Sequence, residues 1–332
     1  MLRRVQDADE TPVALMSSPN SLHLRGALAS LTAFGLYATH DAVVKFLGAD
    51  YAPFQIIFYS TLFAFPLVTI MLMQDRTDGN LRPRHPWWVA ARTFAAVLNV
   101  ICAFYAFSVL PLAQAYSVFF SMPILITLMA IPMLGEKVGI HRGVAVIVGL
   151  VGVLIVLRPG EAPISLGQLA ALGAAMTGAF VSVVLRKIGS EERAAVILLY
   201  PMVANFAVMA CIIPFVYQPM PIEHLGLLGL MSVLGISGGL FIISAYRNAP
   251  AIIVAPMQYS QIVWAVLYGT LFFDEETDAW TLAGTAVIIA SGIYVVLREG
   301  TPSVSENRPV LESRTRAETG IITRLTHILK RR

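Results

Sequence analysis

Three ionisable residues lie close together inside an apolar stretch: His40, Asp41 and Lys45. Asp41 and Lys45 are four residues apart, so on a helix they can form an ion pair on one face. Ionisable side chains in an apolar segment are costly and usually face the protein interior or a water-filled path. Two interpretations are open: binding of a polar ligand or a proton, or a structural ion pair whose lysine extends outward.

Uncharged polar and aromatic side chains recur in three further apolar stretches. They are Asn99 and Tyr105, then Gln114, Tyr116 and Ser121, then Gln258, Tyr259, Gln261 and Trp264. A polar side chain in apolar surroundings needs a hydrogen-bond partner, so these residues are expected to face inward, as ligand contacts or as bonds between helices. Tyr and Trp can stack on a flat or cationic ligand, or simply pack. We therefore predict a ligand-binding set of these nine residues with His40, Asp41 and Lys45.

No catalytic group, metal site or cofactor is predicted. The six histidines are scattered along the chain, and the two cysteines, Cys102 and Cys211, lie in apolar stretches outside any CxxC motif. The sequence also has no HExxH motif and no glycine-rich phosphate loop. These absences, with no domain of concentrated basic charge, argue against an enzyme and against a nucleic-acid partner.

The elements that must position these residues are membrane-spanning helices. Hydrophobic residues make up 57% of the chain and charged residues 13%, about half the usual charged fraction of a soluble protein. Open strands would leave backbone groups unpaired in lipid, so helices are expected. The apolar blocks predict an all-α membrane protein with ten spans, near 26–47, 52–73, 87–109, 112–134, 141–157, 165–186, 194–216, 224–246, 250–273 and 279–297.

The basic residues predict the orientation of these spans. If the N-terminus is cytoplasmic, all of the 23 Lys and Arg residues except Lys45, Arg92 and Arg158 fall on the cytoplasmic side. The opposite side carries the acidic loop 274–278. Both termini are therefore predicted to be cytoplasmic, as an even number of spans requires.

An internal repeat divides the spans into two halves. Ala106, Pro111, Ser121, Leu128 and Glu136 recur 139 positions later as Ala245, Pro250, Ser260, Leu267 and Glu275. In the same way Lys45 corresponds to Arg186 at a shift of 141. Five spans in each half place the halves in opposite orientations across the membrane, so two inverted five-helix repeats are predicted. The predicted boundaries are 1–24 for an N-terminal tail, 25–160 and 161–298 for the repeats, and 299–332 for a cytoplasmic tail.

Three other features have open roles. Arg92, one turn beyond two tryptophans, is expected to extend to the cytoplasmic interface rather than bind an anion. Ser237–Gly239 could bend or unwind its span, or allow close packing. Five prolines, Pro123, Pro132, Pro201, Pro214 and Pro256, are expected to kink their spans. The segment from about 316 to 332 has an amphipathic pattern with basic residues and is expected to lie on anionic lipid.

Several motifs resemble the EamA branch of the drug/metabolite transporter superfamily. They are Asp41-Ala-Val-Val-Lys45, Phe107-Ser-Val-Leu-Pro-Leu-Ala-Gln-Ala-Tyr116, Ser121-Met-Pro123, Leu134-Gly-Glu-Lys137 and the glycine-rich stretch 149–160. The resemblance covers about residues 25–300. It implies secondary transport of a small organic metabolite by alternating access, through a central cavity lined by spans 1, 3, 4, 6, 8 and 9.

The resemblance also implies partners and leaves the cargo open. The start of the first span is similar to members that take up metabolites such as S-adenosylmethionine or riboflavin, so uptake of a polar or aromatic metabolite across a bacterial inner membrane is favoured. Proton coupling is left open, because His40 could couple a proton or simply make a buried hydrogen bond. An exporter of amino acids, metabolites or drugs is the alternative, and a membrane enzyme or a channel is a remote one. The other expected partners are membrane lipid and, if the protein is a homodimer rather than a monomer, a second copy.

Overall fold

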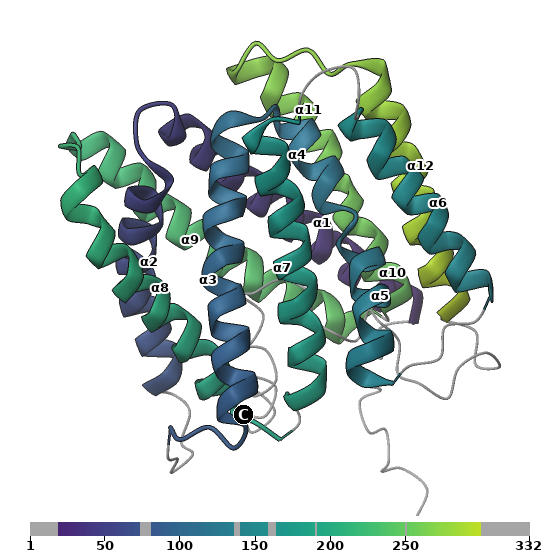
Figure 1. Cartoon of the computed structure of the whole chain (residues 1–332), viewed down its shortest axis with the longest axis horizontal. Coiled ribbons are helices and arrows are strands. Elements are labelled where there is room, and N and C mark those ends of the chain that lie inside the picture. Colours follow the sequence, from purple (N-terminus) through teal and green to yellow (C-terminus); the bar gives the residue numbers. More distant parts are fainter. Residues whose placement is uncertain are drawn as a thin grey trace, which may run out of the picture.

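The computed structural model describes residues 19–73, 81–135, 140–158, 164–189, 191–249 and 251–299, and every regular element in these ranges is a helix (Figure 1). The helices are α1 (Pro19–Gly48), α2 (Pro53–Met73), α3 (Pro86–Val109), α4 (Leu112–Phe119), α5 (Met122–Leu134), α6 (Ile140–Leu157), α7 (Leu166–Ile188), α8 (Ala194–Val216), α9 (Ile222–Asn248), α10 (Ala251–Val254), the 3₁₀ helix η1 (Ala255–Ser260), α11 (Gln261–Phe272) and α12 (Ala279–Glu299). The predicted tail helix at 316–332, and Glu136 and Lys137 of the family motif, lie outside the described residues.

These helices form ten spans when α4 with α5, and α10 with η1 and α11, are each counted as one interrupted span of the described chain. The prediction of an all-α membrane protein with ten spans is confirmed. Five stretches are long and apolar enough to cross a membrane by length and composition: Pro86–Val109, Leu112–Leu134, Leu166–Ile188, Ala195–Val216 and Ile222–Asn248. The first helix begins at Pro19, about two turns before the predicted start of its span.

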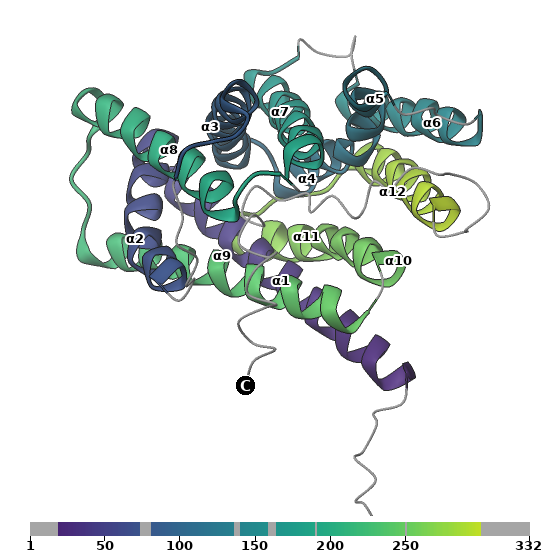
Figure 2. The same ribbon diagram turned by 90° about the horizontal axis from the view of Figure 1, so that it is seen from below.

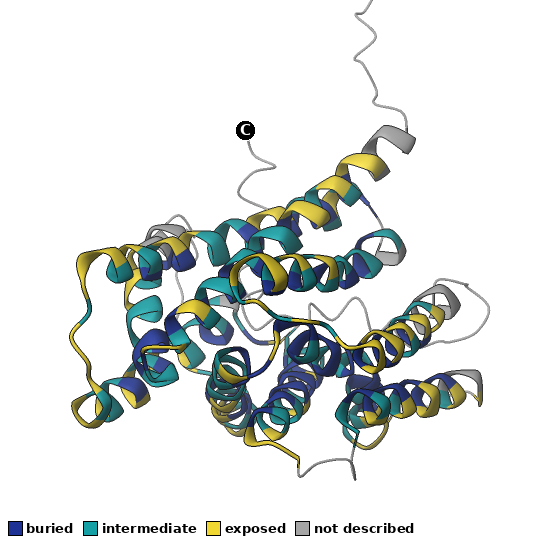
Figure 3. Ribbon diagram, turned by 90° about the horizontal axis from the view of Figure 1, so that it is seen from above, coloured by how far each residue is buried: buried dark blue, intermediate teal, exposed yellow. Residues whose placement is uncertain are grey.

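The outer faces of the helices carry large apolar side chains. Phe94, Ile147, Leu154, Phe215 and Val263 are all exposed, and exposed residues line the outside of the bundle in Figure 3. A soluble monomer rarely exposes so much continuous apolar surface, whereas a lipid-facing surface requires it.

The packing follows the duplication. Helix α1 packs along α9, and α3 packs along α7, in two rows that face each other in Figure 2. In the repeat, α1 is equivalent to α7, and α9 is equivalent to α3. The α1–α9 pair is therefore equivalent to the α3–α7 pair. Three further pairs of repeat mates pack against each other: α6 with α12, α2 with α8, and the two interrupted spans through α4 and α11. The fold is therefore two equivalent five-span halves that pack across a shared interface.

Two spans are interrupted at repeat-related positions. Helix α4 ends at Phe119, and α5 begins at Met122 with Pro123 in its first turn. The equivalent span changes from α-helix to the 3₁₀ helix η1, which has Pro256 in its first turn. Proline has no N–H to continue the helical bonding, so it ends or kinks a membrane helix. By contrast, α9 is continuous through Gly238, where an added Cβ would lie 2.7 Å from the Tyr37 ring, so those glycines allow close packing.

Close contact between α6 and α12 gives a prediction for stability. A Cβ on Gly284 would lie 2.6 Å from Cγ2 of Val156 and 2.8 Å from the carbonyl oxygen of Gly152. The backbone of α6 cannot yield as a flexible side chain could, so Gly284→Ala is expected to destabilise the protein by about 1–3 kcal/mol. Thermal unfolding in lipid nanodiscs measures this. Gly143→Ala, where an added Cβ would meet nothing within 4 Å, is the control, and an equal loss in both variants would contradict the prediction.

Candidate functional site

A cavity of about 210 Å³ lies between the two halves, and we call it the central cavity. It is lined by Phe34, Tyr37, Asp41, Asn99, Ala103, Phe107, Tyr116, Phe119, Phe120, Met122, Pro123, Ala174, Gly178, Val181, Ile242, Tyr246, Gln258 and Gln261. These residues come from spans 1, 3, 4, 6, 8 and 9, the spans that the resemblance implied. The interrupted segments of both spans lie in the lining. Backbone N–H and C=O groups that lack a helical partner there can form hydrogen bonds inside the protein, away from lipid.

A hydrogen-bonded chain centred on Asp41 crosses this cavity. Tyr116 of α4 donates its hydroxyl to Oδ2 of Asp41 at 2.5 Å, and Nε2 of Gln261 lies 3.4 Å from the Tyr116 hydroxyl. The other carboxylate oxygen, Oδ1, is 2.8 Å from Nδ1 of His40. Asp41 is only 3% exposed. The chain joins α1, α4 and α11, so it links the first half to the second through one buried carboxylate.

Aromatic rings line the same cavity as this carboxylate. The Tyr116 ring lies 5.4 Å from Phe107 and 6.1 Å from Phe120, and Phe119 lies 5.1 Å from Phe107, measured between ring centroids. Asp41 is the only charged residue among the described residues of the lining. A single carboxylate among π-faces favours a small organic cation, because both groups attract positive charge.

Five of the twelve predicted site residues line the central cavity: Asp41, Asn99, Tyr116, Gln258 and Gln261. Asn99 also donates Nδ2 to the carbonyl oxygen of Ala174 at 2.6 Å, which ties α3 to α7. The set is thus drawn from both halves, and α1, α3, α4, η1 and α11 each position one member.

The other predicted residues lie elsewhere. Ser121 is buried and bonds to the carbonyl of Val118, Tyr259 packs against Phe120, and Trp264 packs against Tyr268. Tyr105 and Gln114 are half-buried outside the cavity linings. His40 lines a neighbouring cavity. These six side chains share the polar or aromatic character of the set, but they do not line the central cavity.

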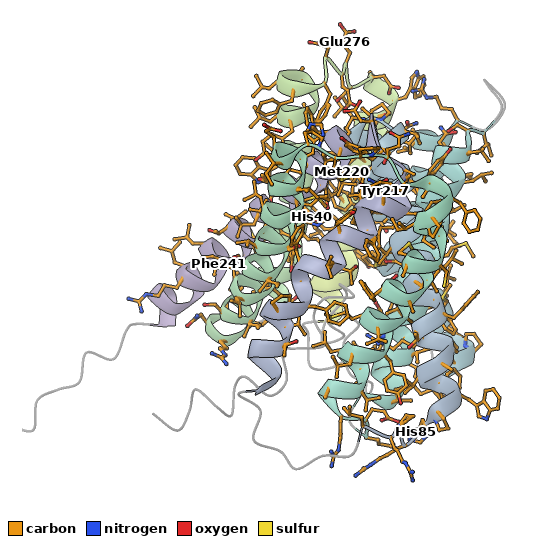
Figure 4. All side chains as sticks on the ribbon, turned by 90° about the vertical axis from the view of Figure 1, so that its left-hand side faces the viewer. His40, His85, Tyr217, Met220, Phe241 and Glu276 are labelled. Atoms are coloured by element: carbon orange, nitrogen blue, oxygen red, sulfur yellow. The ribbon has the colours of Figure 1, made fainter. Side chains whose placement is uncertain are left out.

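The expected Asp41–Lys45 ion pair is replaced by another pair. Lys45 Nζ lies 2.7 Å from Oε1 of Glu275 and donates to the carbonyl oxygen of Leu110 at 2.6 Å. Oε2 of Glu275 accepts the Leu112 N–H at 3.0 Å. Lys45 pairs with Glu275 rather than Asp41 because it is near the end of α1, where the turn after α11 brings a carboxylate within reach. This pair ties α1 and the α3–α4 turn to the second half at the end where Glu276 lies in Figure 4.

The opposite end, where Figure 4 shows His85, has different contacts. His85 Nε2 is 2.6 Å from Oε2 of Glu191, and the His85 N–H donates to Glu192. Arg92, one and a half turns into α3, is 3% exposed and donates to the carbonyl oxygen of Ile197 at 2.7 Å. Its expected extension to the interface was therefore wrong, because α8 covers it.

Sequence reasoning missed most of the aromatic lining, such as Phe34, Tyr37, Phe107 and Tyr246. Their spacing carried a usable signal in two cases: Tyr37 is one turn before Asp41 on α1, and Phe107 opens the motif that ends at Tyr116. The others share no motif, and an aromatic residue in a membrane helix most often only packs.

The fold and cavity define a class: a multi-pass membrane protein whose two equivalent halves enclose a small-molecule cavity, the architecture of a transporter. The family model of the EamA-like transporter family matches residues 24–158 and again 165–298. The chain therefore belongs to this family, within the drug/metabolite transporter superfamily, and is a transporter of small metabolites and not an enzyme.

Several relatives are similar over most of the chain. An uncharacterised transporter of Helicobacter pylori (strain J99) is 29% identical, covering 77% of this chain and 89% of its own. An S-adenosylmethionine uptake transporter of Rickettsia conorii is 24% identical, covering 79% and 89%. A pseudopaline exporter of Pseudomonas aeruginosa is 26% identical, covering 81% and 94%. One crystal structure, 21% identical, matches with a TM-score of 0.57 over 84% of this chain and 98% of its own, which supports the fold.

Proposed function

We propose that this protein takes up a small organic cation that carries a flat ring, of the class of S-adenosylmethionine, by secondary transport through the central cavity. The observation that carries the proposal is Asp41, a buried carboxylate in an aromatic-lined cavity shared by both halves. The carboxylate and the rings would hold the positive centre, and the amides of Asn99, Gln258 and Gln261 would bond to polar groups of the ring system.

The charge of the cavity lining favours a cationic cargo, such as S-adenosylmethionine, over an anionic one. S-adenosylmethionine has a sulfonium cation and an adenine ring, which match a carboxylate and aromatic walls. An anionic cargo would need cationic partners, and the described lining contains no Lys or Arg. This observation favours the cation, although one relative is named an exporter of a different metabolite. Riboflavin, a flat neutral molecule, would use the rings but not the charge of Asp41.

Transport would proceed by alternating access of the two halves. Lys45 and Glu275 close one end, and both cavities extend from mid-span toward the His85 end. Rocking of the halves would exchange the closed ends, with the breaks in the interrupted spans as hinges. The loop charges favour cytoplasmic termini, and the bacterial relatives favour an inner-membrane location. A C-terminal fluorescent-protein fusion tests this orientation, since it fluoresces only if that end is cytoplasmic.

A matched pair of ligands tests the proposed cargo class. S-adenosylhomocysteine differs from S-adenosylmethionine by one methyl group and the sulfonium charge. Purified protein in nanodiscs is expected to gain thermal stability with S-adenosylmethionine and to bind the homocysteine analogue at least about tenfold more weakly, a difference of roughly 1.4 kcal/mol. Saturable uptake of labelled S-adenosylmethionine into proteoliposomes, accelerated by unlabelled compound inside, would support the carrier. Equal binding of both ligands, or of neither, would overturn the proposed class.

A further inference from the structure

A second cavity of about 230 Å³ lies beside the central cavity, and we call it the side cavity. Its walls come from α2, α3, α8 and α9, with His40 as the contribution of α1. Most of the lining is apolar, but it also contains the polar side chains of His40, Ser60, Thr61, Asn205 and Ser232. Figure 4 places His40 about midway between the Glu276 and His85 ends.

Asn205 marks the side cavity as a place that requires a polar occupant. Its side chain is 8% exposed, and Oδ1 has no hydrogen-bond partner among the described residues. A buried acceptor without a donor costs about 1–3 kcal/mol. The hydroxyl of Ser232 donates to the carbonyl of Ser60 at 2.8 Å, so its lone pairs remain available as acceptors. Water satisfies such groups when a cavity is roomy enough and offers two or more polar partners, and this one offers both.

One hydrogen bond joins the two cavities. His40 faces the side cavity and Asp41 faces the central cavity, because consecutive residues of a helix point about 100° apart. Nδ1 of His40 is 2.8 Å from Oδ1 of Asp41, which leaves Nε2 as the second hydrogen-bonding atom of the ring. Histidine is the side chain best suited to gain and lose a proton near neutral pH. The imidazole therefore lies between the side cavity and the carboxylate.

We propose that the side cavity holds water and is the route by which protons reach Asp41 through His40, apart from the cavity that holds the substrate. A hydronium ion gives its proton to Nε2 of His40, and Nδ1 passes its own proton to Oδ1 of Asp41. Asp41 becomes neutral, and the imidazole is again neutral in the opposite tautomer. This inference rests on the proposed function for its consequence: a proton and an organic cation compete for one carboxylate, so protonation of Asp41 through His40 promotes release of the cation.

The charged and titratable groups around the pair allow this route. The described residues that line the side cavity include no Asp, Glu, Lys or Arg, so His40 is its proton acceptor. On the central side the titratable neighbours are Asp41 itself and the phenols of Tyr37 (α1), Tyr116 (α4) and Tyr246 (α9). Two basic residues of α1 and α3 are engaged elsewhere: Lys45 with Glu275, and Arg92 with the carbonyl of Ile197.

A test of hydration needs no substrate. In a variant with Cys102→Ala and Cys211→Ala, a single cysteine is placed at Asn205 or, as control, at Val97, which is 9% exposed, does not line the cavity and packs in a cluster with Met209. A thiol reacts as the thiolate, which water stabilises and an apolar core does not, so Asn205→Cys is expected to react with a small methanethiosulfonate at least about tenfold faster than Val97→Cys. Equal slow rates would show a dry cavity and overturn the proposal.

A second measurement tests the proton route. In proteoliposomes with a trapped pH dye, Asn205→Leu is expected to lower the proton flux coupled to S-adenosylmethionine movement about tenfold, because leucine removes the polar partner of the water. Exchange of labelled for unlabelled S-adenosylmethionine stays within about twofold, since the central cavity is untouched. Met202→Leu, an apolar change in the same lining, is the control. Wild-type proton flux in Asn205→Leu overturns the route, whereas absence of S-adenosylmethionine transport in the wild type overturns only the proposed cargo and leaves the cysteine rates to decide.

Discussion

Replacing Asp41 with asparagine is expected to weaken binding of S-adenosylmethionine by about 30-fold or more, the equivalent of 2 kcal/mol or more for a charge-assisted contact. Asp41 is the only charge in the described lining of the central cavity, and it lies away from bulk water. Asparagine keeps the shape and can still accept from Tyr116, so the protein should fold. Isothermal titration calorimetry on the purified protein measures the affinity.

Two further variants show whether the charge itself is responsible. Asp50→Asn removes an equal charge from the exposed turn after α1 and is expected to leave affinity unchanged. Tyr116→Phe removes one hydrogen bond to Oδ2 but keeps the ring and the carboxylate, so a loss of only about 3- to 10-fold is expected. If Asp41→Asn bound as tightly as the wild type, Asp41 would have only a structural role.

The sequence predicted most of the fold because lipid imposes a simple rule. An apolar block long enough to span a membrane must be a helix, and the edges of the predicted spans agree with α2, α3 and α8 to within a residue or two. Two of the five prolines expected to kink their spans, Pro123 and Pro256, lie where the helical bonding fails, at equivalent points of the two halves. The other three, Pro132, Pro201 and Pro214, lie within continuous helices. The repeat offset then determined which helices would be equivalent before any packing was known.

The site was less predictable because it depends on which face of each helix turns inward. Tyr259 and Gln258 are neighbours, yet only Gln258 lines the central cavity, while Tyr259 packs against Phe120. The 3₁₀ geometry of η1 changes the angle between successive side chains, so an α-helical spacing cannot assign these faces. The Lys45–Glu275 pair joins residues from opposite halves, and sequence proximity suggested Asp41 instead.

Neutralising one member of the Lys45–Glu275 pair is expected to have the other large effect. The two side chains are 12% and 14% exposed, so removal of either charge leaves the other largely buried and uncompensated. The loss of one partner costs about 3–5 kcal/mol of stability in the conformation in which the Glu276 end is closed. Lys45→Met or Glu275→Gln should therefore lower thermal stability in nanodiscs and shift the protein toward opening at the Glu276 end.

The double variant separates the ion pair from its other bonds. Glutamine at 275 can still accept the Leu112 N–H, and with Lys45→Met no charge remains buried, so the double variant should lose less stability than the sum of the single losses. A charge reversal should recover less, because a lysine at 275 would face the Leu112 N–H and a glutamate at 45 the Leu110 carbonyl. Glu191→Gln, in the exposed His85 pair with side chains 38% and 59% exposed, should change stability by less than about 1 kcal/mol. Additive losses at Lys45 and Glu275 would mean that the two charges act independently and that the pair does not hold this end closed.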